Sequence, residues 1–164
     1  MLALQDLLCI ERIAVQVPAT DWRDAVRRVG RLLVESGAVE ERYIEGMIHT
    51  AEELGPYIVI APGVAMPHSR PEDGVRRPCM ALITLRDPIN FGSPDNDPVR
   101  LVFAFGAVDK KQHIEALSQL ANAFSQFFSE QGGIQSLLDA QTPQELMQTM
   151  LDAAAESSQD SVKQ

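Results

Sequence analysis

Hydrophobic and polar positions along the chain follow two periods, and their alternation predicts an α/β domain. Apolar residues recur every three or four positions in four long segments, which predicts amphipathic helices near residues 22–33, 40–54, 110–129 and 143–154. Shorter apolar runs predict strands near residues 12–17, 57–60, 64–66, 79–85 and 99–107. The run at 79–85 is almost continuously apolar, which indicates a central strand buried on both faces. Short helices are expected near residues 2–9 and 134–139.

Capping and turn-forming residues mark where the first two long helices begin and end. Thr20 or Asp21 can accept a hydrogen bond from the first turn of the helix that begins near residue 22. Gly37 supplies the left-handed residue that commonly follows a helix end. Gly55 and Pro56 stop the second helix, because proline cannot continue a helical ladder.

Similar signals place the later elements. Asp109 with Gln112, and Thr142 with Glu145, have the spacing of capping boxes at the starts of the last two long helices. Residues 87–97 are rich in proline, glycine, asparagine and aspartate, and predict a long loop between two core strands.

A tight hairpin carries the most distinctive residue of the chain. Pro62 and Gly63 fit the two central positions of a type II turn between short strands. Pro67 lacks an N–H group, so we expect the chain to leave the sheet there, unless it lies at an edge. His68 then lies just beyond a strand end, where open α/β sheets usually place their chemistry.

His68 is the leading candidate for chemistry. An unperturbed pKa of about 6.5 leaves much of an imidazole neutral near pH 7, so it can accept a proton, a metal or a phosphoryl group. Arg70 follows two residues later, and a guanidinium matches phosphate oxygens with two parallel hydrogen bonds. His113 falls in the first turn of a predicted helix, where anionic oxygens are favoured. Each could instead be a residue with a purely structural role.

Length, composition and charge narrow the class of protein. The chain of 164 residues fits one domain, which we place at residues 1–152, followed by a small polar tail at 153–164 that we expect to be flexible. The net charge of −9 argues against nucleic acid as a partner and favours a basic protein surface. No run approaches the length of a membrane helix and no signal segment opens the sequence, which predicts a cytoplasmic protein.

Other kinds of site find less support in the sequence. Cys9 and Cys79 both lie among apolar residues and are expected to be buried free thiols. No phosphate-binding glycine loop and no nucleophile elbow occurs. A metal-dependent hydrolase that uses His49, His68 and His113 is a weak alternative, because none of these is spaced as a ligand pair on one helix.

Two segments resemble the signature sequences of the mannitol/fructose-type enzyme IIA of the bacterial phosphotransferase system. They are residues 60–68 (IAPGVAMPH) and 113–121 (HIEALSQLA). Residues 55–63 (GPYIVIAPG), 70–75 (RPEDGV) and 95–99 (DNDPV) are similar to the ascorbate-specific branch in particular. The resemblance extends over nearly the whole chain and implies an α/β fold, an α+β sandwich with a mixed five-stranded sheet flanked by helices on both sides.

The resemblance implies a phosphocarrier that acts on proteins and has no direct small-molecule substrate. His68 would take a phosphoryl group on its tele nitrogen from the phosphocarrier protein HPr and pass it to an enzyme IIB, and through it to a membrane IIC permease. In ascorbate-type systems the IIB acceptor is a cysteine. His113 matches the second active-site histidine, which supports the phosphoryl group. This chemistry implies no cofactor and no metal.

The sequence departs from the mannitol branch at one position. That branch has an arginine sixteen residues before the acceptor histidine, where this chain has Glu52, and a carboxylate cannot replace a guanidinium. Arg70 is the candidate substitute. An alternative function is a regulatory IIA-like module whose phosphorylation state controls a binding partner. The sugar cannot be deduced, because enzyme IIA does not contact it.

Overall fold

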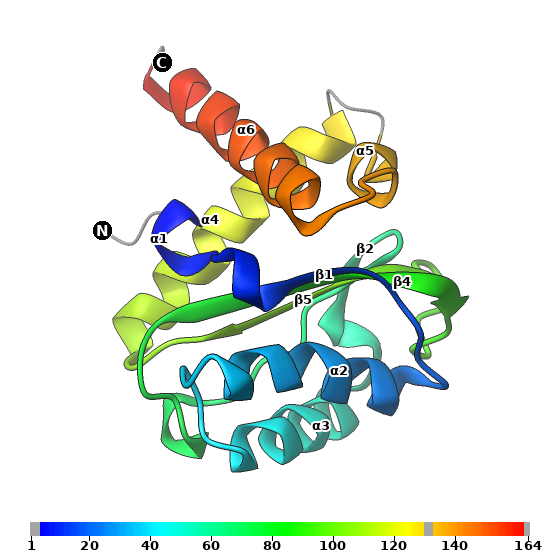
Figure 1. Ribbon diagram of the computed structural model, residues 1–164, viewed down its shortest axis with the longest axis vertical. Coiled ribbons are helices and arrows are strands. Elements are labelled where there is room, and N and C mark those ends of the chain that lie inside the picture. The colour runs from blue at the N-terminus through cyan, green and yellow to red at the C-terminus, as the bar shows by residue number, and fades with distance from the viewer. Residues whose placement is uncertain (1–3, 130–132, 163–164) are drawn as a thin grey trace.

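A five-stranded mixed sheet lies between two layers of helices in the computed structural model, which describes residues 4–129 and 133–162 (Figure 1). The spatial order of the strands is β1-β4-β5-β3-β2. Their bounds are β1 Ile13–Val17, β2 Val59–Ala61, β3 Val64–Ala65, β4 Cys79–Ile89 and β5 Val99–Gly106. The expected fold class is therefore confirmed.

Parallel and antiparallel pairs alternate across the sheet. β1 runs parallel to β4 and β3 runs parallel to β5, whereas the β4–β5 and β2–β3 pairs are antiparallel. β4 and β5 occupy the centre, so the side chains of residues 79–85 are buried on both faces, as their apolar run predicts.

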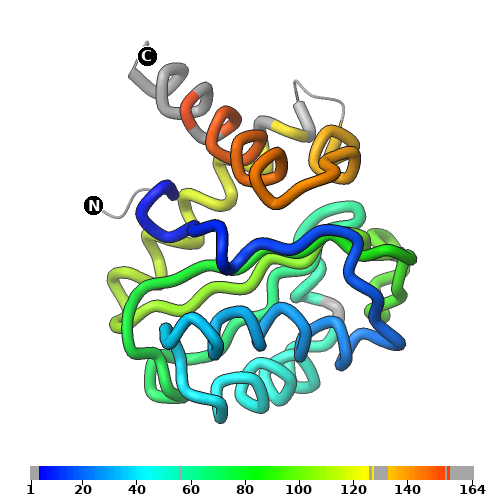
Figure 2. The backbone as a smooth tube through the Cα atoms, viewed as in Figure 1, coloured from blue at the N-terminus to red at the C-terminus, as the bar shows by residue number. Residues whose placement is uncertain are grey.

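The helices form two hydrophobic layers on the two faces of the sheet. One face packs against α2 Trp22–Glu35 and α3 Arg42–Leu54, which lie side by side in Figure 2. The other face is covered by α1, α4 and α6. The bounds on this side are α1 Leu4–Leu7, α4 Lys110–Ser129, α5 Gln135–Leu138 and α6 Pro143–Val162. None of the helices in the described residues is both long and apolar enough to span a membrane.

The predicted caps are present. Asp21, rather than Thr20, accepts a hydrogen bond from the amide of Asp24 at the start of α2, and Gly37 follows its end with a φ of 76°. The amide of Gln112 donates to Asp109 at 2.8 Å, and the amide of Glu145 donates to Thr142 at 3.1 Å.

Several element boundaries differ from the sequence prediction. Gly55–Ile58 forms a 3-10 helix, so the strand expected at residues 57–60 begins only at Val59. The left-handed φ of 65° at Gly55 ends α3, and the chain makes this turn before it can extend. β4 continues to Ile89, because Ile89 pairs with Val99 beyond an irregularity in the ladder, and the loop is correspondingly shorter than expected. α6 runs to Val162 instead of ending near residue 154.

The buried row of α4 was only partly predicted. Its buried residues are Ala116, Leu120, Ala123, Phe124 and Phe127. Ile114, which the three- and four-residue spacing of apolar positions in this segment places in the same row, is 56% exposed. It lies two residues before Ala116 and therefore about 200° around the helix. Ala121, also assigned to the row, is exposed.

Candidate functional site

His68 lies at the edge of the sheet, beside the carboxyl end of β5. Pro67 interrupts β3, but the chain does not leave the sheet there as expected, because His68 forms an isolated parallel bridge with Phe105. This bridge keeps the register that Ala65 and Val102 set. On the β2 side, the amide of Met66 still donates to the carbonyl of Ile58 at 2.7 Å, and Pro67 is the first residue after this bond.

A backbone carbonyl selects one tautomer of the His68 imidazole. Its Nδ1 lies 2.9 Å from the carbonyl oxygen of Met66. A carbonyl oxygen only accepts, so Nδ1 carries the proton and Nε2 keeps a free lone pair. Burial lowers the pKa of His68, and the Met66 carbonyl opposes this shift. The neutral imidazole with a free Nε2 is therefore the form present near pH 7.

His113 completes a cluster of three rings, as the sequence placed it. Its ring centroid is 5.4 Å from that of His68 and 5.1 Å from that of Phe105. The Phe105 ring also stacks on His68, with centroids 5.1 Å apart. Burial lowers the pKa of His113, and so does the charge that His68 carries when protonated. The two imidazole rings therefore lie next to each other and against the apolar ring of Phe105, beside the first turn of α4.

Tyr43 reaches this cluster from α3, and sequence reasoning missed it. The spacing of apolar residues in the segment 40–54 places Tyr43 on the apolar face of the helix, and its side chain is fully buried. Its hydroxyl donates to the carbonyl of Phe105 at 2.7 Å and accepts from the amide of Ser69 at 3.0 Å. The one available signal was that a buried tyrosine usually finds a hydrogen-bond partner.

The Ser69 side chain belongs to a second polar group on the α3 side of the loop. Its hydroxyl donates to the carboxylate of Asp73 and lies 3.4 Å from the hydroxyl of Thr50. Ser69 is buried, and a Cβ at Gly46 would come within 2.9 Å of its Oγ. The loop after His68 is therefore packed tightly against α3.

Arg70 lies in solvent beside this loop. Its side chain is 81% exposed and its Nε is 3.8 Å from the carboxylate of Glu72. A salt bridge as exposed as this one adds little stability. The structure therefore brings His68 and His113 together, while the Arg70 side chain lies outside their ring cluster.

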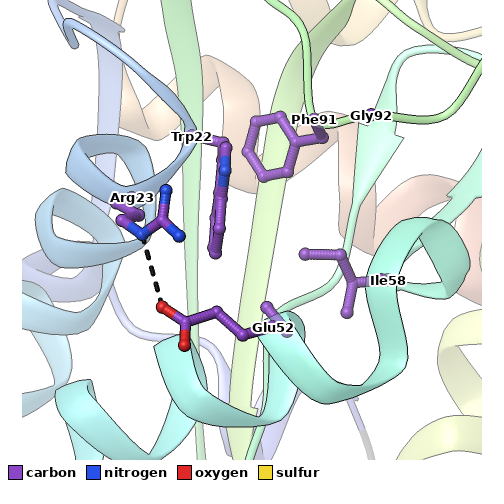
Figure 3. Close-up of a pocket in the computed structure, with 8 residues that line it drawn as sticks. Trp22, Arg23, Glu52, Ile58, Phe91 and Gly92 are labelled. Atoms are coloured by element: carbon purple, nitrogen blue, oxygen red, sulfur yellow. Dashed lines mark hydrogen bonds and ion pairs between the residues drawn. The ribbon is translucent and has the colours of Figure 1, made fainter.

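Glu52 lies near the opposite end of the sheet from His68. Its carboxylate pairs with Arg23 at 3.3 Å in a groove of about 480 Å³ that Trp22 and Phe91 also line (Figure 3). The α3 side chains of Tyr43 and Thr50 both reach Ser69 in the loop after His68, and Thr50 lies about 200° around the helix from Glu52. Glu52 therefore lies in this groove and not beside the loop after His68.

The remaining candidates take no part in this cluster. His49 is exposed and pairs with Glu53 at 3.0 Å. Cys79 is buried, as expected, whereas Cys9 is only partly buried. Burial raises the pKa of both thiols, that of Cys79 to about 11. Among the residues that the structure describes, no group of three or more histidine, cysteine, aspartate or glutamate side chains could hold a metal ion.

Comparison with known proteins shows one family. The family model of the phosphoenolpyruvate-dependent sugar phosphotransferase system, EIIA 2, matches residues 6–153. The chain is 42% identical over 123 residues to the ascorbate-specific PTS system EIIA component of Shigella dysenteriae, which covers 74% of this chain and 80% of that protein.

Solved structures show the same fold. The mannitol-specific cryptic phosphotransferase enzyme IIA CmtB from Escherichia coli aligns with a TM-score of 0.74 at 32% identity, over 90% of this chain and 97% of that one. Enzyme IIA of the mannitol system, in its complex with phosphorylated enzyme IIB from the same organism, aligns with a TM-score of 0.75 at 25% identity, over 88% and 97% of the two chains.

Proposed function

Because this chain belongs to the EIIA 2 family of the phosphoenolpyruvate-dependent sugar phosphotransferase system, we propose that it carries the phosphoryl group on His68. EIIA components are phosphotransferase components, which transfer phosphoryl groups between proteins. The observation that supports His68 is the state of its ring. Nδ1 is held by the Met66 carbonyl, and Nε2, the tele nitrogen, keeps its lone pair.

The chemical step follows from this tautomer. The Nε2 lone pair of His68 attacks phosphorus in the phosphohistidine of the donor protein while the donor's P–N bond breaks and the donor nitrogen keeps the electron pair. In the second step a nucleophile of the acceptor protein attacks phosphorus, and the electron pair of the His68 P–N bond returns to Nε2. His68 keeps its Nδ1 proton throughout, so neither step requires a proton to move on His68.

The groups around Nε2 supply the charge stabilisation. A phosphoryl group in transfer spreads negative charge over its equatorial oxygens, which donors placed around it stabilise. His113 is one such group, with its ring 5.4 Å from that of His68, and it belongs to the first turn of α4. Arg70 is our proposal for a further contact, and it would have to leave Glu72 to reach the phosphoryl group.

The partners follow from the family. We propose phosphorylated HPr as the donor, an enzyme IIB as the acceptor and a IIC permease as the final destination, for uptake of a sugar that is L-ascorbate in the ascorbate-specific relatives. The transfer would take place in the cytoplasm. The net charge of −9 suits basic protein partners better than nucleic acid.

Phosphorylation by purified partners tests the proposal. The protein is incubated with phosphoenolpyruvate, enzyme I and HPr, and we expect one acid-labile phosphate per chain, assigned to Nε2 by NMR. His68→Ala should abolish the label. His113→Ala should still be labelled but should transfer to enzyme IIB at least about 10-fold more slowly, as expected for loss of one charge-stabilising group.

Two control variants separate site effects from general damage. His49→Ala removes the remaining histidine of the chain, which is exposed, and should leave labelling unchanged. Arg70→Ala should slow transfer several-fold, whereas Arg76→Ala, at another exposed arginine, should not. Normal labelling of His68→Ala would refute the proposal, and equal rates for the two arginine variants would remove Arg70 from the site.

A further inference from the structure

The hydroxyl of Tyr43 lies between two strands at the point where their pairing ends. β3 pairs with β5 through Val64 and Ala65, and the ladder resumes for a single bridge at His68. One residue further, the amide of Ser69 donates to the Tyr43 hydroxyl at 3.0 Å. That hydroxyl donates in turn to the carbonyl of Phe105 at 2.7 Å. A side chain from α3 thus links a backbone donor and a backbone acceptor of neighbouring strands.

The direction of these bonds is determined by the chemistry of the groups. A phenol has one proton, and the Phe105 carbonyl at 2.7 Å is much closer to the oxygen than the Ser69 carbonyl at 3.3 Å. The proton therefore points to Phe105, and a lone pair receives the Ser69 N–H. Burial raises the pKa of Tyr43, so this proton remains in place at neutral pH.

The link holds the backbone next to His68, whereas Met66 holds its ring. The Met66 carbonyl holds the ring at Nδ1, and the Tyr43 hydroxyl holds the backbone amide that directly follows His68. The linked carbonyl belongs to Phe105, whose ring stacks on the His68 imidazole. One hydroxyl therefore ties the backbone of the reactive residue to the backbone of the residue on which its ring rests.

We propose that Tyr43 is a positioning residue for His68, whose hydroxyl holds the backbone so that Nδ1 stays on the Met66 carbonyl and Nε2 stays free. The expected effect on phosphoryl transfer rests on the proposed function. The expected effect on the tautomer of the His68 ring does not. Without the hydroxyl, the Ser69 amide and the Phe105 carbonyl would be buried without this partner. The loop would then shift to reach water, and the ring would lose its fixed tautomer.

Tyr43→Phe tests the inference, because it removes the hydroxyl and keeps the ring. ¹⁵N NMR of the imidazoles measures the tautomer of His68 without any partner protein. We expect the wild type to hold almost wholly the Nδ1–H tautomer and the variant to show a mixture. The rate of phosphoryl acceptance should fall on the order of 10- to 100-fold, as for a reacting group displaced by about 1 Å.

Two matched controls exclude general effects. Tyr57→Phe makes the same change at the chain's other tyrosine, which is 81% exposed. Thr84→Val removes a buried hydroxyl that accepts from the amide of Gln16 at 2.9 Å, at a site in β4 away from His68. It should therefore lower stability as Tyr43→Phe does. Neither control should change the His68 tautomer or the rate.

The outcomes distinguish the two proposals. A wild-type tautomer and rate in Tyr43→Phe would overturn the positioning role. A changed tautomer, in a protein whose wild type accepts no phosphoryl group, would support the positioning role and refute the proposed function. If Tyr43→Phe does not fold, hydrogen exchange of the wild type decides, because the Ser69 amide must then exchange as slowly as the core. Fast exchange there would overturn the inference.

Discussion

Substitution of Gly46 by alanine tests how tightly the loop that carries His68 packs against α3. A Cβ at this position would lie 2.9 Å from Oγ of Ser69 and 3.2 Å from both Cβ and Oδ2 of Asp73. Ser69 cannot simply move away, because it is buried and its hydroxyl is bonded to Asp73. Gly46→Ala should therefore displace the residue next to His68.

Two opposing free-energy terms determine how much Gly46→Ala changes the stability of the protein. Alanine in the interior of a helix is favoured over glycine by about 1 kcal/mol. Overpacking of a well-packed site costs about 1–3 kcal/mol, and a strained Ser69–Asp73 hydrogen bond adds about 1 kcal/mol. We therefore expect Gly46→Ala to destabilise the protein by about 1–3 kcal/mol and to slow phosphoryl acceptance on the order of 10-fold.

Gly30→Ala is the matched control. Gly30 is also a helical glycine, and its Cβ would lie 2.9 Å from Cγ1 of Ile44 and from Cε of Met47, away from the loop. It should change stability by a similar amount but leave the rate of phosphoryl acceptance unchanged. Urea unfolding measures the first quantity, and labelling by phosphorylated HPr measures the second. A Gly46→Ala variant about 1 kcal/mol more stable than the wild type, with the wild-type rate, would refute tight packing of the loop.

Other predictions concern titration, charge and thiol reactivity. The pKa values of His68 and His113 are lowered by burial, so the free energy of unfolding should fall as the pH drops from about 6.5 through their folded pKa values, because the unfolded chain binds these protons first. Urea midpoints from pH 5 to 7.5 should lose part of this slope in His68→Ala and the rest only when His113 is also replaced. Phosphorylation places negative charge beside His113, so its pKa should rise, and an NMR titration that finds no rise would place the phosphoryl group elsewhere. Glu52→Gln should leave the transfer rate unchanged and alter stability by less than about 0.5 kcal/mol, because Glu52 is a partly exposed residue far from His68; a slower transfer would contradict that location. Cys79 is buried and should resist alkylation in the folded protein, whereas Cys9 is only partly buried and should react first. Mass spectrometry can follow the alkylation of each thiol, and faster alkylation of Cys79 would contradict this prediction.

The sequence predicted the parts of the site that depend on local chemistry. Pro62 and Gly63 gave the turn, confirmed by a φ of 79° at Gly63, and the apolar runs placed His68 beside a strand end. Asp109 and Gln112 positioned the first turn of α4, and with it His113. Each of these inferences needs only a few neighbouring residues, which explains why they succeeded.

The errors concern contacts between distant segments. Tyr43 lies 62 residues from the carbonyl to which it donates, so no local pattern could separate it from an ordinary core residue. The helical rotation of α3, which places Thr50 against the loop and Glu52 beside Arg23, could not be fixed from the sequence alone. The extension of β4 to Ile89 depends on its partner Val99 and could not be predicted from β4 alone.

The isolated bridge between His68 and Phe105 has a consequence for how the protein matures. β3, the strand before His68, is only two residues long. The contacts around His68 therefore come from α3, β5 and α4, which are far apart along the chain. Bringing such distant segments together costs the conformational entropy of closing long loops, so the orientation of the His68 ring depends on the complete fold. A partly folded chain would hold the histidine but not its oriented ring. Only a completely folded chain would therefore accept a phosphoryl group. Incompletely folded chains would not take phosphoryl groups from the phosphorylated donor protein.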